Sequence, residues 1–134
     1  MARLGLTKDD IIFFYKTDPE ATEPQRGSAG SAGFDLYSLA SIHIQPWGTV
    51  VADTGIAVKL PEGCYGRIAA RSGLACQHSL TILGGVVDCD YTGSIFVVLK
   101  NLSNFDIHLP AKGRIAQLIL EKIQRNGKIL NPTQ

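Results

Sequence analysis

Residues 79–101 have the sequence S-L-T-I-L-G-G-V-V-D-C-D-Y-T-G-S-I-F-V-V-L-K-N, in which glycines separate short runs of apolar and β-branched residues. Apolar runs of roughly four to eight residues suit the pleated surface of a sheet and are short for stable helices. Turn sequences rich in Gly and Pro continue on both sides, for example at residues 61–63 and 110–113. The segment therefore predicts a protein built from many short strands.

The remainder of the chain supports an all-β fold. Only residues 71–78 favour a helix, and Gly73 keeps it short because glycine is a poor helix former. We expect a single domain over residues 1–134, an antiparallel jelly-roll or β-clip barrel with one short helix. The expected strands are residues 11–16, 34–37, 42–44, 49–52, 55–60, 64–69, 79–83, 94–101, 105–109 and 114–123.

Composition excludes several classes of protein. The chain of 134 residues is 45% apolar and 19% charged, which excludes a disordered protein. Its 13 basic and 12 acidic residues give a net charge of +1, which argues against stable nucleic-acid binding. Cys64, Cys76 and Cys89 lack the spacing of a zinc site or a disulfide framework. No apolar run approaches the roughly 20 residues of a membrane helix, so we expect a soluble, intracellular protein of cytoplasm or nucleus.

The segment 85–93, G-V-V-D-C-D-Y-T-G, is the first candidate for chemistry. Two valines lead into Asp88, and a second apolar run begins after Gly93, so we expect a hairpin with Asp88, Asp90 and Tyr91 at its tip. Exposed carboxylates on sharply turned backbone suit a general base. The alternative is that both aspartates only satisfy the backbone of the turn.

Three further segments carry polar residues in settings that need explanation. Residues 70–75, A-R-S-G-L-A, place Arg71 and Ser72 at a helix start, where a cation, a hydroxyl and backbone N–H groups suit an anion. Gln117 interrupts an apolar strand in G-R-I-A-Q-L-I-L (113–120), where a glutamine also serves simply to satisfy the sheet. Asp35 lies in the apolar A-G-F-D-L-Y-S (32–38) and needs a partner, an ion or water.

In this order and spacing, the four segments resemble the first four signature motifs of the trimeric deoxyuridine triphosphatases, the dUTPase family. The resemblance covers residues 11–123, and four ordered motifs are far more specific than one. It implies a homotrimer of jelly-roll subunits that hydrolyses dUTP to dUMP and pyrophosphate, limiting uracil in DNA and supplying dUMP. Such an enzyme is cellular, viral or retroelement-encoded.

The resemblance also implies a role for each site residue. Asp88 activates the water that attacks the α-phosphorus. Arg71, Ser72, Gly73 and Gln117 bind the phosphates, and Asp35 contacts Mg²⁺ through water, which suits an ion that sheds water reluctantly. Tyr91 packs on the deoxyribose and excludes a ribose 2′-OH. The uracil edge pairs with the backbone at Gly84, Gly85, Val86, Val87 and Asp88.

The sequence departs from the family pattern at three places. Ala70 replaces the usual proline, and Cys89 replaces Glu, Ser or Pro, with a side chain that we expect to point outward. The fifth motif, a glycine-rich arm that closes over the nucleotide, does not occur after Gln117. Either the sequence omits a mobile tail, which we favour, or the protein lacks the arm and is a weak or inactive nucleotide-binding or protein-interaction module. A related alternative is a dCTP deaminase of the same fold.

Overall fold

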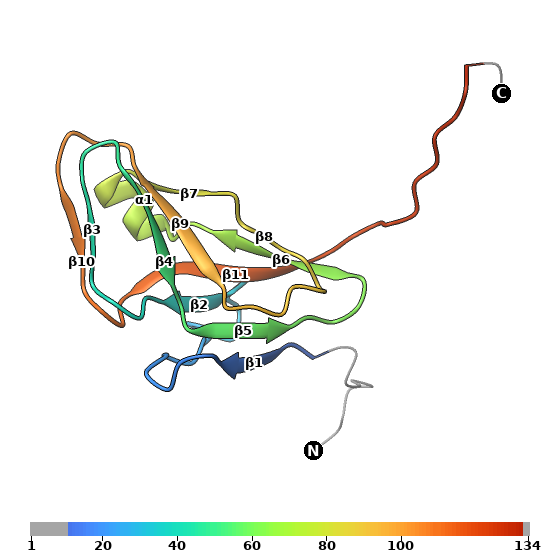
Figure 1. Ribbon diagram of the computed structural model, residues 1–134, viewed down its shortest axis with the longest axis horizontal. Coiled ribbons are helices and arrows are strands. Elements are labelled where there is room, and N and C mark those ends of the chain that lie inside the picture. Colours follow the sequence, from blue (N-terminus) through green and yellow to red (C-terminus); the bar gives the residue numbers. More distant parts are fainter. Residues whose placement is uncertain (1–10, 133–134) are drawn as a thin grey trace.

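The computed structural model describes residues 11–132, which form eleven strands and one short helix (Figure 1). Every strand is between two and nine residues long. The elements are β1 (Phe13–Lys16), β2 (Phe34–Tyr37), β3 (Ile42–Ile44), β4 (Thr49–Asp53), β5 (Ile56–Lys59), β6 (Cys64–Ala69), α1 (Ser72–His78), β7 (Leu80–Leu83), β8 (Val86–Val87), β9 (Phe96–Asn101), β10 (Ile107–Leu109) and β11 (Arg114–Lys122).

Two larger sheets and two strand pairs build a jelly roll. The four-stranded sheet has the order β2-β11-β6-β8 and the three-stranded sheet the order β4-β9-β7, while β1 pairs with β5 and β10 with β3. All of these pairings are antiparallel. Figure 1 shows β9 and β4 crossing in front of β11, and buried residues of both sheets belong to one core. The expected all-β fold is confirmed.

Alternation of apolar and polar residues explains which faces form the core. In β9, Val97 and Leu99 are fully buried while Phe96 is exposed, as expected for a strand with one face inward. In β11, Ala116 and Leu118 are fully buried on the opposing sheet. The largest fully buried apolar side chains are Leu36, Ile44, Ile56, Ile95, Val97, Leu99, Ile115 and Leu118.

The expected bounds of three strands, β2, β3 and β6, match the structure, and the helix starts one residue later than expected. The predicted hairpin around Asp88 is wrong. β8 pairs with β6 in one sheet, whereas β9 pairs with β4 and β7 in the other. The residues after Val87 therefore connect two sheets. The burial of Val87 in the core, and not the turn beside it, determines which strand β8 pairs with.

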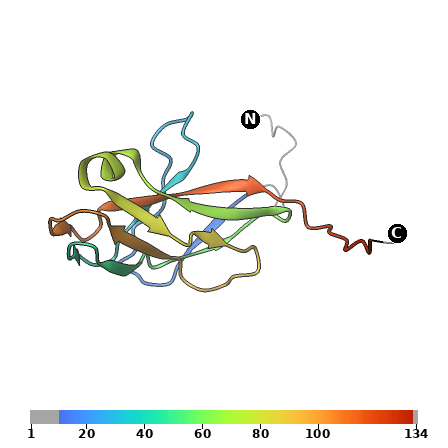
Figure 2. The same cartoon turned by 90° about the horizontal axis from the view of Figure 1, so that it is seen from above.

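The seven-residue α1 is the one helix among residues 11–132, and no helix in that range is long and apolar enough to cross a membrane. Residues 123–132, beyond β11, leave the body of the protein as an extended segment (Figures 1 and 2).

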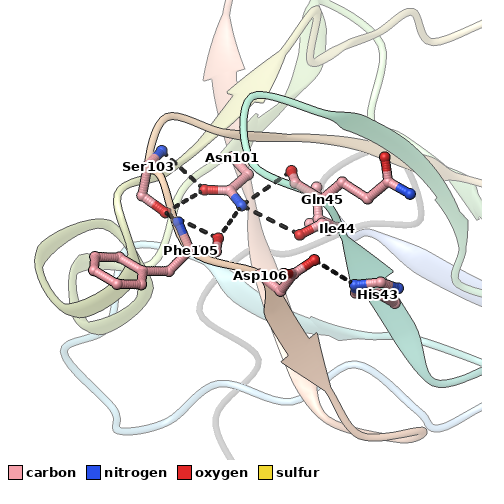
Figure 3. Close-up of polar contacts among 7 residues, drawn as sticks. All are labelled: His43, Ile44, Gln45, Asn101, Ser103, Phe105 and Asp106. Carbon is pink, nitrogen blue, oxygen red and sulfur yellow. Dashed lines mark hydrogen bonds and ion pairs between the residues drawn. The ribbon is translucent and has the colours of Figure 1, made fainter.

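A buried amide fastens one end of the barrel (Figure 3). Asn101 at the end of β9 is 0% exposed, and its Nδ2 donates to the carbonyl oxygens of Ile44, Gln45 and Phe105 at 3.2, 3.1 and 2.7 Å. Its Oδ1 accepts hydrogen bonds from the Ser103 backbone N–H at 2.9 Å and hydroxyl at 2.7 Å. One side chain thus holds the loop after β3 against the loop before β10.

We expect Asn101→Ala to lower the free energy of unfolding by about 3 kcal/mol, because the substitution leaves several buried polar groups without partners. Chemical denaturation monitored by circular dichroism measures this loss. The control is Asn104→Ala, since exposed Asn104 accepts a single bond from the Trp47 indole N–H, and its loss should stay below about 1 kcal/mol. Equal losses for the two variants would contradict the assignment.

Candidate functional site

A polar pocket of about 200 Å³ lies where β2 and β11 meet the start of α1. It contains four of the residues singled out in the sequence, Asp35, Arg71, Ser72 and Gln117. Gly73, the fifth residue expected there, does not line it. The complete lining is Gly27, Ser31, Gly33, Asp35, Arg71, Ser72, Arg114 and Gln117.

Strand register builds this pocket. Gln117 on β11 lies opposite Asp35 on β2 and opposite Ala69 on β6, so the three residues share one level of the sheet. The Gln117 Nε2 donates to the Ala70 carbonyl at 3.2 Å and so ties down the turn that leads into Arg71. A Cβ on Gly33 would lie 2.9 Å from the Leu118 carbonyl oxygen, so only glycine allows β2 to begin so close to β11.

Two arginines flank the carboxylate of Asp35. Its Oδ1 lies 3.7 Å from the Arg71 Nε and its Oδ2 lies 3.6 Å from the Arg114 Nη1, and the Asp35 side chain is only 15% exposed. The three side chains together carry a net charge of +1, which suits an anionic ligand. Arg67, which does not line this pocket, pairs with Glu121, and the hydrogen bond and charge of Glu121 raise the pKa of this guanidinium.

Arg114 is a site residue that the sequence did not reveal. It lies three positions before Gln117, so a regular strand would send the two side chains to opposite faces of the sheet. A bulge between Arg114 and Ala116 adds one residue to β11, and consecutive Ile115 and Ala116 are both buried. The bulge thereby turns Arg114 toward the same pocket as Gln117.

A second pocket, mainly apolar and of about 220 Å³, lies beside β8. It contains all six of the residues expected to bind the base and sugar, including Asp88 and Tyr91. The Tyr91 hydroxyl donates to the Ser94 carbonyl at 2.6 Å, which fixes the orientation of the ring. The complete lining is Ile68, Leu83, Gly84, Gly85, Val86, Val87, Asp88, Tyr91, Ile95, Phe96 and Val98.

The two pockets do not share a lining residue. The polar pocket lies at the β2–β11 side of the four-stranded sheet, and the apolar pocket lies at β8, the opposite edge. Ile68, which lines the apolar pocket, faces the core, whereas its neighbour Ala69 is level with Gln117 on the other face. Within one chain, the residues expected to form a single site therefore form two.

Cys89 does not point outward as expected. Its side chain is half-buried, packs against the core, and accepts a hydrogen bond from the Arg125 Nη2 at 2.9 Å. Cys89 follows the buried Val87 at the spacing of a strand, so its side chain turns to the same inner side. The cysteines Cys64, Cys76 and Cys89 are free thiols.

Adjacent Gly84 and Gly85 give a matched test of the backbone in the apolar pocket. Both have positive φ, +68° and +99°, but a Cβ on Gly85 would lie 2.8 Å from the Ile68 carbonyl oxygen, whereas one on Gly84 meets nothing within 4 Å. Gly84→Ala should lower the free energy of unfolding by about 1 kcal/mol through backbone strain alone. Gly85→Ala should lower it by about 3 kcal/mol because the clash separates β8 from β6. Thermal and chemical unfolding measure both, and similar losses would refute the close approach.

Comparison with known proteins agrees with the architecture. The dUTPase family model matches residues 19–134. The probable deoxyuridine 5′-triphosphate nucleotidohydrolase of Schizosaccharomyces pombe is 49% identical over 119 residues, which cover 89% of this chain and 85% of the relative. The deoxyuridine 5′-triphosphate nucleotidohydrolase of Saccharomyces cerevisiae is 43% identical, with 92% and 84% covered.

Solved structures share the fold. The dUTPase of Staphylococcus bacteriophage 80α with dUPNHPP superposes with a TM-score of 0.86 at 22% identity, covering 92% of this chain and 89% of the other. A mutant dUTPase from phage phi11 of S. aureus, described with a structural Mg(II) ion, gives a TM-score of 0.84 at 21% identity, covering 91% and 97%. The family match over most of its length, together with the close curated relatives, shows that this chain belongs to the dUTPase family.

Proposed function

We propose that the protein hydrolyses dUTP to dUMP and pyrophosphate. The observation that carries the proposal is the pairing, in a member of the dUTPase family, of a cationic pocket with an apolar pocket whose wall holds the exposed carboxylate of Asp88. A nucleoside triphosphate has two matching halves: the nucleoside, with its flat base, and the strongly anionic triphosphate chain. Relatives at 43% and 49% identity that are named dUTP nucleotidohydrolases support the choice of substrate.

In this proposal the apolar pocket binds deoxyuridine. Uracil pairs with backbone groups from Gly84 to Asp88, where the exposed Gly84 leaves the main chain uncovered. The Tyr91 ring, fixed by its bond to Ser94, packs on the deoxyribose and leaves no space for a 2′-OH. Rejection by clashing or unpaired polar groups is an effective way to discriminate close analogues.

The polar pocket binds the triphosphate. Arg71 and Arg114 provide two guanidinium groups that form charge-assisted bonds to phosphate oxygens. Ser72 adds a hydroxyl at the start of α1, where the Arg71 side chain makes no capping bond that would compete for the first N–H groups. Gly73 does not line the pocket and would contribute only its backbone N–H beside it. Gln117 holds the turn before Arg71 through its hydrogen bond to the Ala70 carbonyl, and its other polar groups bind the phosphates.

The donor set of the polar pocket fits a Mg²⁺ ion that arrives with the nucleotide. Asp35 is its one carboxylate, already flanked by two arginines, and residues 11–132 hold no cluster of three metal-ligating side chains. Asp35 would therefore contact the water shell of an ion held mainly by phosphate oxygens. Bound in this way, Mg²⁺ would neutralise phosphate charge and hold the chain for in-line attack.

Asp88 acts as the general base. Its carbonyl accepts a hydrogen bond from the Tyr91 N–H at 3.1 Å, which closes a tight turn and fixes the main chain that carries the exposed carboxylate. The carboxylate takes a proton from the water that attacks the α-phosphorus. The pyrophosphate leaves toward the cationic side of the site, where positive charge stabilises it.

We further propose that the complete site forms between subunits of a homotrimer. The pockets lie at opposite edges of one sheet and share no residue, so one chain does not present both to the same nucleotide. A cyclic assembly repeats one contact around its axis and would bring the polar pocket of each copy to the apolar pocket of the next.

Asp88→Asn should reduce turnover of dUTP at least about a hundredfold with little change in KM, because the amide cannot accept the proton. Pyrophosphate release with Mg²⁺ measures both constants. Asp90→Asn is the matched control, since Asp90 is exposed in the same turn but does not line the pocket, and it should retain nearly full turnover. Wild-type turnover by Asp88→Asn, or ammonia release from dCTP by the unmodified protein, would overturn the proposal.

Subunit mixing tests the shared site. Asp88→Asn disables the apolar side and Arg71→Ala the polar side, so each variant alone should be inactive. Co-expressed with different tags and mixed at random, they should recover about one quarter of wild-type turnover. Half of the apolar pockets and half of the polar pockets are intact in such a mixture, and an active site needs one intact pocket of each kind. A site contained within one chain predicts no recovery beyond the sum of the separate variants.

A further inference from the structure

A loop between Gln25 and Asp35 stands above the four-stranded sheet (light blue in Figure 2). Its base is closed by a hydrogen bond of 2.7 Å from the Asp35 N–H to the Gln25 carbonyl. Residues 26–30 of the loop are exposed, and Ser31 is half-buried. No hydrophobic packing fixes the tip of this loop, so its polar contacts must decide its conformation.

One guanidinium supplies the strongest of these contacts. The Arg26 Nη2 donates to the Ala29 carbonyl at 2.7 Å and to the Ser31 carbonyl at 2.5 Å. The Ser31 hydroxyl accepts a bond from the Ser28 N–H at 2.9 Å, and the Ser31 N–H donates to the Ser28 carbonyl at 3.1 Å. Arg26 therefore holds the loop closed by bonding to carbonyls of the loop itself. Hydrogen bonds from a charged donor are stronger than those from a neutral donor.

The closed loop forms one wall of the polar pocket. Gly27 and Ser31 both line it, and the position of a Cβ on Gly27 is 3.8 Å from the Asp35 Oδ2. Arg26 itself does not line the pocket, because its guanidinium is turned to the carbonyls of its own loop. Its influence on a ligand therefore passes through the placement of Gly27 and Ser31.

We propose that Arg26 is a positioning residue for the phosphate chain of the substrate, and that it presets the Gly27–Ser31 wall before the nucleotide arrives. This inference rests on the function proposed above for the polar pocket. Without Arg26 the loop samples many conformations. The association constant for phosphate is then multiplied by the fraction of time during which the wall is formed, and so it falls. The chemical step, which depends on Asp88, is untouched.

Arg26→Ala tests the inference on the full chain with two independent readouts. Hydrogen exchange of the amides of residues 27–33 should become about tenfold faster. The KM for dUTP and the dissociation constant of inorganic tripolyphosphate should each rise about tenfold, while kcat stays within about threefold and deoxyuridine binding is unchanged. Arg26→Lys should restore most of the loss, because an ammonium can still donate to both carbonyls.

Lys112→Ala provides the charge control, since Lys112 is exposed, pairs with Glu20, and lines neither pocket. It removes the same charge and should leave loop exchange and tripolyphosphate affinity unchanged. A rise in KM for Arg26→Ala without faster loop exchange would show that Arg26 binds phosphate directly and would overturn the positioning role. Faster exchange with unchanged affinity for tripolyphosphate would overturn it as well.

Binding of tripolyphosphate, measured separately from dUTP turnover, tests this inference independently of the proposed function. If the unmodified protein binds tripolyphosphate but releases no pyrophosphate from dUTP, the hydrolase proposal fails while the role of Arg26 is still decided by binding and exchange. If the unmodified protein does not bind tripolyphosphate, the inference about Arg26 fails whatever the turnover.

Discussion

The nine-residue strand β11 is the constraint on which the polar pocket depends. It pairs with β2 on one side and β6 on the other, and both pairings place Gln117 at the level of the pocket, opposite Asp35 and Ala69. Fully buried Leu118 fixes this register, because a slip of one residue would send it to solvent. The polar site is thus held in place by the apolar face of the same strand.

The bulge in β11 shows how a local irregularity serves the chemistry. Without the extra residue before Ala116, Arg114 would leave the pocket and Asp35 would face Arg71 alone. That pair would be electrically neutral, whereas the observed trio carries a net positive charge. The whole chain has a net charge of only +1, so the positive charge of the pocket comes from the placement of the cations and not from their number.

The sequence predicts the all-β class, the bounds of strands such as β2 and β6, and most of the residues that gather at the two pockets. These features follow from local patterns: alternation, turn residues, and polar groups in apolar runs. It does not predict that β8 pairs with β6, that Arg114 joins Gln117, or that Cys89 turns inward. Each of these depends on which distant segment lies alongside, and a bulge of one residue reverses the faces that alternation assigns.

The separation of the pockets also bears on the role proposed for Asp88. None of the ion pairs that the structure describes for residues 11–132 involves Asp88. Arg71 and Arg114 line the other pocket, where Asp35 is the carboxylate that they flank. In the proposed intersubunit site the cations belong to a different subunit and the phosphates lie between them and Asp88, so the carboxylate would meet positive charge only through the substrate.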